Sequence, residues 1–306
     1  MDSLKYYLDV GRASDLKNPK ERFVYRLLEI LPGALIWLTL ILMGFFSWQK
    51  PHWIAYFIIA FCLYWLLRIS HFSFYLIASW RQMKKNFNTD WLGKLGKWNT
   101  AGRKNGQIKN ISNWNQIFHL VVFPMYRENL ALVRETFRAL ASCRYPKEKM
   151  LIVLSVEESA RDSAEIVVRE ISKEFGKNFF KFLATWHPKN LPGEIASKGS
   201  NEAWAGKEAK DKIIDKLKIP YENIIVSAFD IDTQIFPDYF SCLTYSYLTC
   251  RKPLRSSFQP IPLYLNNFWK SPFFSRVVAF SNVFLADISA AAAGKNCHLF
   301  FSFDEL

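Results

Sequence analysis

The chain has 306 residues, of which 50% are hydrophobic and 17% aromatic, and its formal net charge is +13. This length suits about two domains, and the apolar content is high for a soluble protein. The five cysteines form no C-x-x-C pair, and their odd number and wide spacing indicate reduced thiols in a cytosolic domain rather than a disulfide framework.

Two apolar stretches near the N-terminus predict a transmembrane hairpin. Residues 31–48 and 53–67 contain no charged side chain, and apolar character resumes after Arg68 as far as Trp80. A span needs about 20 apolar residues. The first stretch is apolar on every face, which argues against a buried hairpin of a soluble domain. Roughly 30 mostly polar residues precede it, too many for a cleaved signal peptide. Because Arg68 and His71 interrupt the second stretch, its end could lie along the membrane surface.

Basic residues flank this hairpin on both sides, whereas the short connection contains only Lys50. The positive-inside rule places both flanks in the cytoplasm. We therefore predict a multi-pass protein of the cell membrane, with everything after Trp80 cytoplasmic. Clustered lysines and arginines beside membrane spans are attracted to anionic membrane lipid. Nucleic acid is the rival partner for a basic chain, but no nucleic-acid-binding motif is found, so we expect no nucleic acid.

We expect three parts along the chain: an N-terminal segment with the hairpin (1–85), a basic connector (86–115) and an α/β domain (116–306). The connector is rich in Asn, Gly and Lys. Within it, Trp91, Leu92, Leu95 and Trp98 fall at helical spacing. This spacing predicts either a short helix lying on the bilayer or, equally well, a flexible linker.

Strands and helices alternate after the connector. The expected strands are 117–123, 150–156, 179–185 and 224–228, and the expected helices are 128–142, 161–175, 198–210 and 238–249. Such alternation predicts a largely parallel sheet with helices on both faces. Ligands bind such sheets at the carboxyl ends of the strands. We therefore expect the residues that follow the first, second and fourth strands to meet at one edge.

The residues after the fourth strand are the most informative of the chain. Asp230 and Asp232 follow an apolar run directly. In an extended segment their side chains would point to the same side, roughly 6.6 Å apart along the strand. Two carboxylates so placed repel each other unless a cation lies between them, and Mg²⁺ prefers oxygen ligands that include substrate phosphates. The pattern suggests a metal–diphosphate site, although Asp-x-Asp also occurs in ordinary turns and helix caps.

Four segments in order resemble family 2 glycosyltransferases of the GT-A fold, over residues 117–285. The first-strand segment is Pro124-Met125-Tyr126-Arg127-Glu128, in which Arg127 replaces the family's usual Asn. The others are the acidic end of the second strand (Glu157-Glu158-Ser159), the Lys-x-x-Asn stretch at Lys198 and Asn201, and Asp230-Ile231-Asp232 followed by Phe236-Pro237-Asp238.

This resemblance implies an N-terminal membrane hairpin followed by a nucleotide-sugar-binding GT-A domain that transfers a sugar to an acceptor. Mg²⁺ or Mn²⁺ would be the cofactor, bound by Asp230 and Asp232, and a UDP-sugar would be the expected donor. Glu157 or Glu158 would bind the base or ribose, and Lys198 would lie near the phosphates. The implied donor-binding residues are Pro124, Tyr126, Glu157, Glu158, Lys198, Asn201 and Asp230.

Two features of the family are not found. No acidic pair that would supply the general base follows the Asp-x-Asp motif, and there is no Gln-x-x-Arg-Trp stretch. Asp304-Glu305 would be a poor substitute because chain ends are usually mobile. We therefore expect a truncated copy that binds donor but lacks a base worth roughly 10²–10⁴-fold in rate. Residues 273–293 are apolar, and either an interfacial helix or a core helix of a missing part would explain them.

Two alternatives stay open. Phosphotransferases of the haloacid-dehalogenase type also carry Asp-x-Asp after an apolar strand, but they place it on the first strand and favour Thr or Val where this chain has Gln234. Alternatively, the chain is a membrane-anchored donor-binding or scaffold protein that has lost catalysis. Turnover would exclude this second alternative, whereas cation-dependent binding without turnover would support it.

Overall fold

The computed structural model describes residues 12–98, 111–191, 194, 197–258, 260–263, 272–278 and 300–303. The chain divides into two compact units, residues 1–73 and 74–306. The helices are α1 (Pro19–Gln49), α2 (Pro51–Phe87), α3 (Trp91–Gly96), α4 (Leu130–Ser142), α5 (Arg161–Phe175), α6 (Lys198–Ala209) and α7 (Tyr239–Thr249), and a π-helical turn η7 (Lys210–Ile214) follows α6. The strands are β1 (Phe118–Met125), β2 (Met150–Glu157), β3 (Lys181–His187), β4 (Ile224–Ala228), β5 (Pro260–Leu263) and β6 (Phe300–Phe303).

The first unit holds α1 and the first part of α2. The Asn18 side chain caps α1 by accepting a hydrogen bond from the Lys20 amide, and Pro19 occupies the first helical position, where its missing N–H costs nothing. By length and composition, α1 (31 residues) and α2 (37 residues) could each cross a membrane. Their apolar windows are not buried by other parts of the chain.

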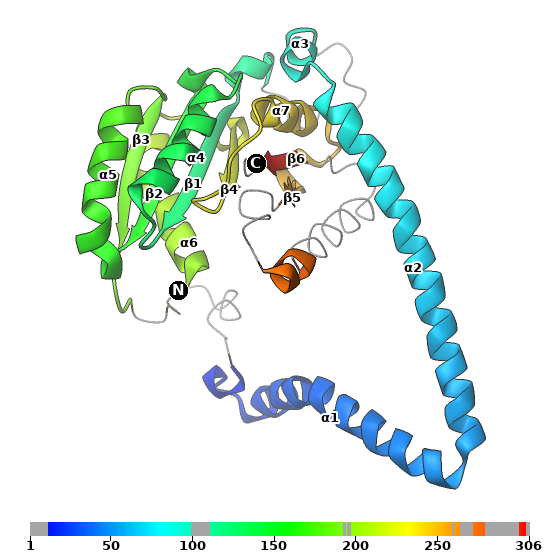
Figure 1. Ribbon diagram of the computed structural model, residues 1–306. Coiled ribbons are helices and arrows are strands. Elements are labelled where there is room, and N and C mark those ends of the chain that lie inside the picture. The colour runs from blue at the N-terminus through cyan, green and yellow to red at the C-terminus, as the bar shows by residue number, and fades with distance from the viewer. Residues whose placement is uncertain are drawn as a thin grey trace. The chain divides into compact units, whose positions relative to one another are not determined.

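The second unit contains a four-stranded sheet in the order β3-β2-β1-β4 (Figure 1). Every neighbouring pair of strands is parallel, as the alternation of strands and helices predicts. All four carboxyl ends therefore lie at the same edge. The crossing segments between strands contain α4, α5 and α6, which is the usual way to connect parallel strands.

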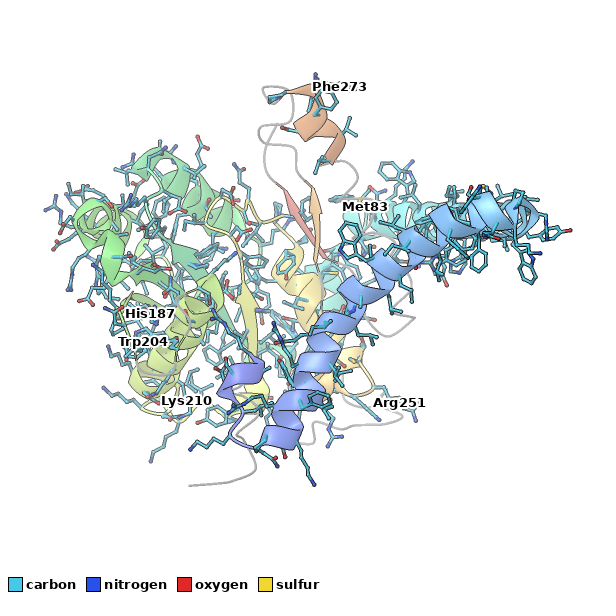
Figure 2. All side chains as sticks on the ribbon, turned by 90° about the horizontal axis from the view of Figure 1, so that it is seen from below. Met83, His187, Trp204, Lys210, Arg251 and Phe273 are labelled. Carbon is cyan, nitrogen blue, oxygen red and sulfur yellow. The ribbon has the colours of Figure 1, made fainter. Side chains whose placement is uncertain are left out.

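Alternate residues of β1 bury into two separate cores. Val121 and Phe123 pack in a large cluster with residues of α4, α5 and α7. Leu120 and Val122 pack on the opposite face with Ala205 of α6 and residues beyond it. Because successive side chains of a strand point to opposite faces, this division places α6 and η7 on one side of the sheet and α4, α5 and α7 on the other. On the α6 side, the ring of Trp204 lies 5.8 Å from that of His187, the last residue of β3 (Figure 2).

The last turns of α2 belong to the second unit and pack on it. Met83 and Asn86 are buried, and the ring of Phe87 lies edge-on to Phe236 with 4.9 Å between centroids. Phe236 lies between the Asp-x-Asp motif and α7. The apolar stretch whose end could lie along a membrane surface stops at Trp80, so the packing of residues 83–87 does not test that expectation.

Helix α3 corrects the expectation that the segment around Trp91 lies on the bilayer or is a flexible linker. A helix does form at the spacing of Trp91 and Leu95, but both side chains are buried in the large core rather than available to lipid. The Trp91 indole N–H donates to the Asn86 carbonyl at 2.9 Å, and its ring lies 5.5 Å from that of Tyr245 in α7. The amphipathic face of this segment is therefore satisfied by the domain itself.

β1, β2 and β4 are found close to their predicted positions, whereas β3 is shifted by two residues toward the C-terminus. β3 was expected at 179–185 but covers 181–187, so His187 ends the strand. Of the apolar segment 273–293, the structure describes 273–278, which are helical with exposed apolar side chains such as Phe273 and Phe274. The remainder of that segment, Cys297 and Asp304-Glu305 lie outside the described residues.

Candidate donor-binding site

A cleft of about 330 Å³ opens at the carboxyl edge of the sheet. It is bounded by the ends of β1 and β2, the start of α6 and the turn after β4. All of the predicted site residues except Glu158 line it: Pro124, Tyr126, Glu157, Lys198, Asn201, Asp230 and Asp232, together with Met125, Glu128, Leu132 and Ile231. Glu158 lines a neighbouring pocket, which shares Glu157 with this cleft.

The two aspartates lie on a turn rather than on an extended strand. β4 ends at Ala228, and the Thr233 amide donates to the Asp230 carbonyl at 2.9 Å, which closes the turn. Ile231 is buried, and its carbonyl accepts a 2.6 Å hydrogen bond from the buried Thr136 hydroxyl of α4. Asp230 and Asp232 are exposed on the cleft side. The prediction of extended geometry was therefore wrong, but a buried residue between two exposed ones still directs both carboxylates into one cleft.

Lys198 contacts Asp230 directly across the cleft. Its ammonium group forms an ion pair with Asp230 Oδ1 and lies 3.8 Å from Glu202 Oε1. Lys198 is the first residue of α6, after the cap residue Ser197, whose hydroxyl accepts a hydrogen bond from the Ser200 amide. The amino end of α6, with its partial positive charge, therefore borders the cleft together with a lysine. Both partners of the ion pair are more than half exposed, so the pair itself contributes little to stability.

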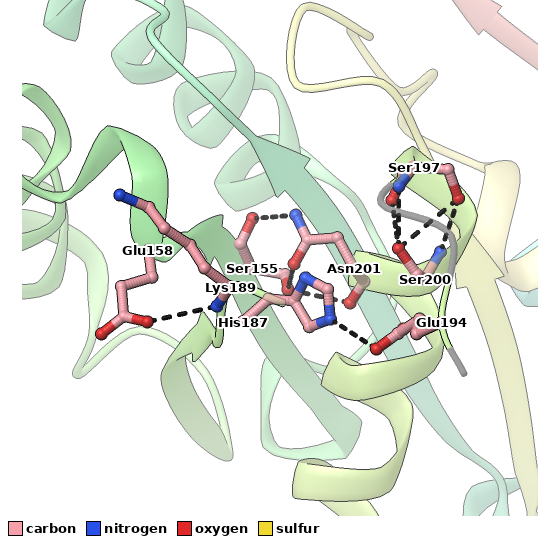
Figure 3. Close-up of polar contacts among 8 residues, drawn as sticks. All are labelled: Ser155, Glu158, His187, Lys189, Glu194, Ser197, Ser200 and Asn201. Atoms are coloured by element: carbon pink, nitrogen blue, oxygen red, sulfur yellow. Dashed lines mark hydrogen bonds and ion pairs between the residues drawn. The ribbon is translucent and has the colours of Figure 1, made fainter. Parts of the chain in front are cut away.

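Asn201 lines the cleft but uses its side chain inside the protein (Figure 3). Its Oδ1 lies 2.5 Å from the Ser155 hydroxyl, and its Nδ2 donates to the Ser155 carbonyl at 3.1 Å. The Thr185 hydroxyl donates in turn to the Ser155 hydroxyl at 3.1 Å. All three residues are buried, so this network ties α6 to β2 and β3. Asn201 holds the start of α6, and hence Lys198, in position.

The segment after β1 contributes a backbone loop closed by Glu128. The Glu128 carboxylate accepts a 2.7 Å hydrogen bond from the Tyr126 amide, and the Arg127 guanidinium lies 4.9 Å from the centre of the Tyr126 ring. Tyr126 remains 41% exposed, so its ring is available to a ligand. Glu128 was not among the predicted site residues, although its place in the first-strand motif was a signal that could have identified it.

A second pocket of about 180 Å³ adjoins the cleft at Glu157. It is lined by Glu157, Glu158, Ser159, His187, Pro188, Lys189, Asn190, Leu191 and Glu194. His187 Nε2 lies 3.3 Å from Glu194 Oε2, and the Lys189 amide donates to Glu158 at 3.3 Å (Figure 3). His187 was missed because the third strand was expected to end at Thr185. The register pairs it with Glu157, so these two residues end neighbouring strands.

The chemistry of the cleft fits a hard divalent cation. Asp230 and Asp232 supply carboxylate oxygens on one wall, and cations such as Mg²⁺ often take only one or two protein carboxylates and complete their shell with water and phosphate. Among the residues that the structure describes, no group of three or more His, Cys, Asp and Glu side chains is placed to hold a metal ion. Asp230 and Asp232 could therefore supply only part of the ligand shell of a cation, and water or another ligand would have to supply the rest.

Comparisons with known proteins give distant matches only. No protein-family model and no curated protein matches the chain. S. aureus TarS, in a crystal structure of residues 1–349, matches with 17% identity and a TM-score of 0.30, covering 42% of this chain and 32% of that chain. A second TarS structure has 16% identity and a TM-score of 0.34, covering 49% and 22%.

A third match is the mannosyltransferase PcManGT from Pyrobaculum calidifontis, solved with GDP-Man and Mn²⁺. It is 16% identical with a TM-score of 0.33, covering 71% of this chain and 48% of that chain. This chain thus spans less than half of each of these proteins. With TM-scores below 0.5, these matches do not establish a shared architecture.

Proposed function

We propose that this chain is a membrane-anchored glycosyltransferase that binds a nucleotide-sugar donor with Mg²⁺ or Mn²⁺ in the cleft at the carboxyl edge of the sheet. The observation that carries the proposal is the convergence of Asp230, Asp232, Lys198 and Glu157 from three separate segments on one cleft. These residues belong to three of the four motifs that resemble family 2 enzymes. A UDP-sugar is the first donor to test.

The roles follow from charge and position. Asp230 and Asp232 would hold the cation, which when bound neutralises charge on the diphosphate leaving group. Lys198 would contact the phosphates as a point charge, aided by the amino end of α6. Glu157 and Glu158 are placed on the side of the second pocket, where their carboxylates would accept hydrogen bonds from the ribose or base. The general base for the acceptor stays unassigned.

The membrane part of the proposal rests on two observations. α1 and α2 are long and apolar enough to span a bilayer. Basic residues flank both helices, and only Lys50 lies between them. We therefore place the α/β domain on the cytoplasmic side of the cell membrane, where nucleotide sugars are available, with anionic lipid as a further partner.

The decisive experiment compares the wild type with Asp232→Asn in detergent micelles. Calorimetric titration with UDP-sugars in Mn²⁺ and in EDTA should show cation-dependent binding by the wild type. Asp232→Asn should weaken it by roughly tenfold or more, since even residues that merely orient metal ligands change affinity by about 10- to 100-fold. Asp211→Asn is the matched control, because Asp211 is exposed and pairs with Lys210 outside the cleft.

Three results are informative. Equal binding by wild type and Asp232→Asn would refute the metal assignment. Binding without sugar transfer to any acceptor would favour the alternative of a donor-binding scaffold. A phosphorylated aspartate after incubation with a phosphate donor would instead favour the phosphotransferase class.

A further inference from the structure

The Lys198–Asp230 ion pair occupies an oxygen that the proposed cation needs. The Lys198 ammonium contacts Asp230 Oδ1 directly. Asp232, the second carboxylate of the motif, has no ion pair with any residue that the structure describes. One of the two aspartates that would hold the cation is therefore already neutralised by a side chain of the protein, whereas the other is not.

A divalent cation and the Lys198 ammonium cannot both lie against Asp230 Oδ1 without strong repulsion, because both are positive and the cleft is small. Entry of the cation must displace Lys198. The displaced ammonium can retain Glu202, which already lies 3.8 Å away on the same helix. It can also turn toward an anion that enters with the cation, because its side chain is 53% exposed and borders the same cleft.

We infer that Lys198 is an exchangeable counter-ion that makes cation binding and diphosphate binding depend on each other. Without ligand it holds Asp230. When a cation and a nucleoside diphosphate bind together, the cation takes Asp230 and the freed lysine pairs with the diphosphate. The diphosphate half of this inference rests on the proposed function, but the competition between Lys198 and the cation does not.

The competition predicts opposite effects of one substitution. Lys198→Met removes the competing charge, so Mn²⁺ alone should bind more tightly, by roughly 5-fold or more if the coupling lies in the usual range of about 5- to 150-fold. The same variant should bind UDP or GDP more weakly in the presence of Mn²⁺, because the diphosphate loses a cationic partner. A residue that only stabilised the fold would weaken both.

Mn²⁺ affinity measured by electron paramagnetic resonance, with and without UDP or GDP, tests this on the full-length chain. Lys198→Arg keeps the charge and should keep Mn²⁺ affinity near that of the wild type. Lys210→Met is the matched control, because Lys210 follows the last residue of α6, outside the cleft, and forms a 2.7 Å ion pair with Asp215. It should change neither affinity.

Unchanged or weaker Mn²⁺ binding by Lys198→Met overturns the inference. Tighter Mn²⁺ binding by this variant supports the competition even if neither nucleotide binds the wild type. In that last case the proposed function fails while the competition stands, so the two failures can be told apart. Equal Mn²⁺ affinity with and without a bound nucleotide overturns the coupling.

Discussion

At the scale of single residues, the geometry of the cleft depends on buried polar groups. Thr136 holds the carbonyl between the two aspartates, and the Ser155–Asn201 pair fixes the start of α6. A buried polar group left without its partner costs about 1–3 kcal/mol, so such contacts define one geometry of the cleft rather than several. Tyr126, Lys198, Asp230 and Asp232, which also line the cleft, are by contrast exposed.

His119 is a buried group whose protonation lowers the stability of the folded second unit at acidic pH. Nothing of it is exposed, its Nε2 lies 2.8 Å from the Thr244 hydroxyl, and its ring packs edge-on to Tyr145 at 4.6 Å. Burial lowers the pKa of His119 from 6.5 to about 3. The unfolded chain therefore takes up a proton below pH 6.5, whereas the folded chain does not until about pH 3.

Acidification through this window should destabilise the second unit. The free energy of unfolding contributed by this group falls by roughly 1.4 kcal/mol for each pH unit, because protonation favours the unfolded state. Denaturant unfolding in detergent between pH 7 and pH 4 measures it. His119→Leu should be less stable at pH 7, because it removes the hydrogen bond to the buried Thr244 hydroxyl, but its stability should fall less steeply on acidification. Equal pH slopes for the variant and the wild type would contradict this.

At the scale of elements, β1 and β2 could be predicted because their mostly apolar residues are buried on both faces of the sheet, and β4 because it is a short run of β-favouring residues before the aspartates. β4 is found at its predicted position, and β1 and β2 differ by one or two residues. The ends are less certain because a polar residue such as His187 can end a buried strand if its ring packs, as here against Trp204. The strand propensity of residues near His187 does not predict its contact with Trp204, which lies in α6.

The surface on which an amphipathic helix packs likewise cannot be predicted from the sequence of that helix alone. The spacing of Trp91 and Leu95 indicates one apolar face, but lipid and protein satisfy such a face equally well. The answer depends on Tyr245 of α7, about 150 residues away along the chain. The extended geometry assumed for Asp230 and Asp232 was also wrong, because the Thr233 amide closes a turn after β4 and Thr136 of α4 holds the Ile231 carbonyl.

Helix α3 gives a direct test of its buried placement. Trp91→Ala should lower the free energy of unfolding of the second unit by about 3–5 kcal/mol, the usual cost of removing a large buried side chain. Trp80→Ala, which removes an exposed indole from α2, should cost far less. Thermal unfolding in detergent measures both. If Trp91→Ala instead lowered affinity for lipid vesicles and left stability unchanged, α3 would belong on the bilayer.

At the scale of the whole molecule, the chain has an apolar part, made of the two long helices α1 and α2, and basic segments that flank it. An α-helix rises about 1.5 Å per residue and a bilayer core is about 30 Å thick, so about 20 residues suffice to span it. α1 and α2 both exceed this length, at 31 and 37 residues. Part of the surplus of α2 lies in its last turns, where Met83, Asn86 and Phe87 pack on the second unit.

The distribution of charge predicts which side of the membrane each part occupies. Lys50 lies between α1 and α2, whereas exposed lysines such as Lys177 belong to the α/β domain. Lys50→Cys should react with a membrane-impermeant maleimide added outside intact cells. Lys177→Cys should react only after permeabilisation, because a basic domain beside membrane spans stays cytoplasmic.

The natural cysteines set the background of this experiment. Cys143 and Cys242 are buried, and burial raises the pKa of both thiols well above the usual range, so they react slowly. Cys62 of α2 is exposed and Cys250 is half-buried, so both contribute to the background labelling. The wild type measures whatever reaction remains. Labelling of Lys177→Cys in intact cells would show that the α/β domain lies outside the cell. The proposed reaction would then lack the cytoplasmic nucleotide sugar on which it depends. Labelling of Lys50→Cys only after permeabilisation would mean that the connection between α1 and α2 does not reach the outer surface.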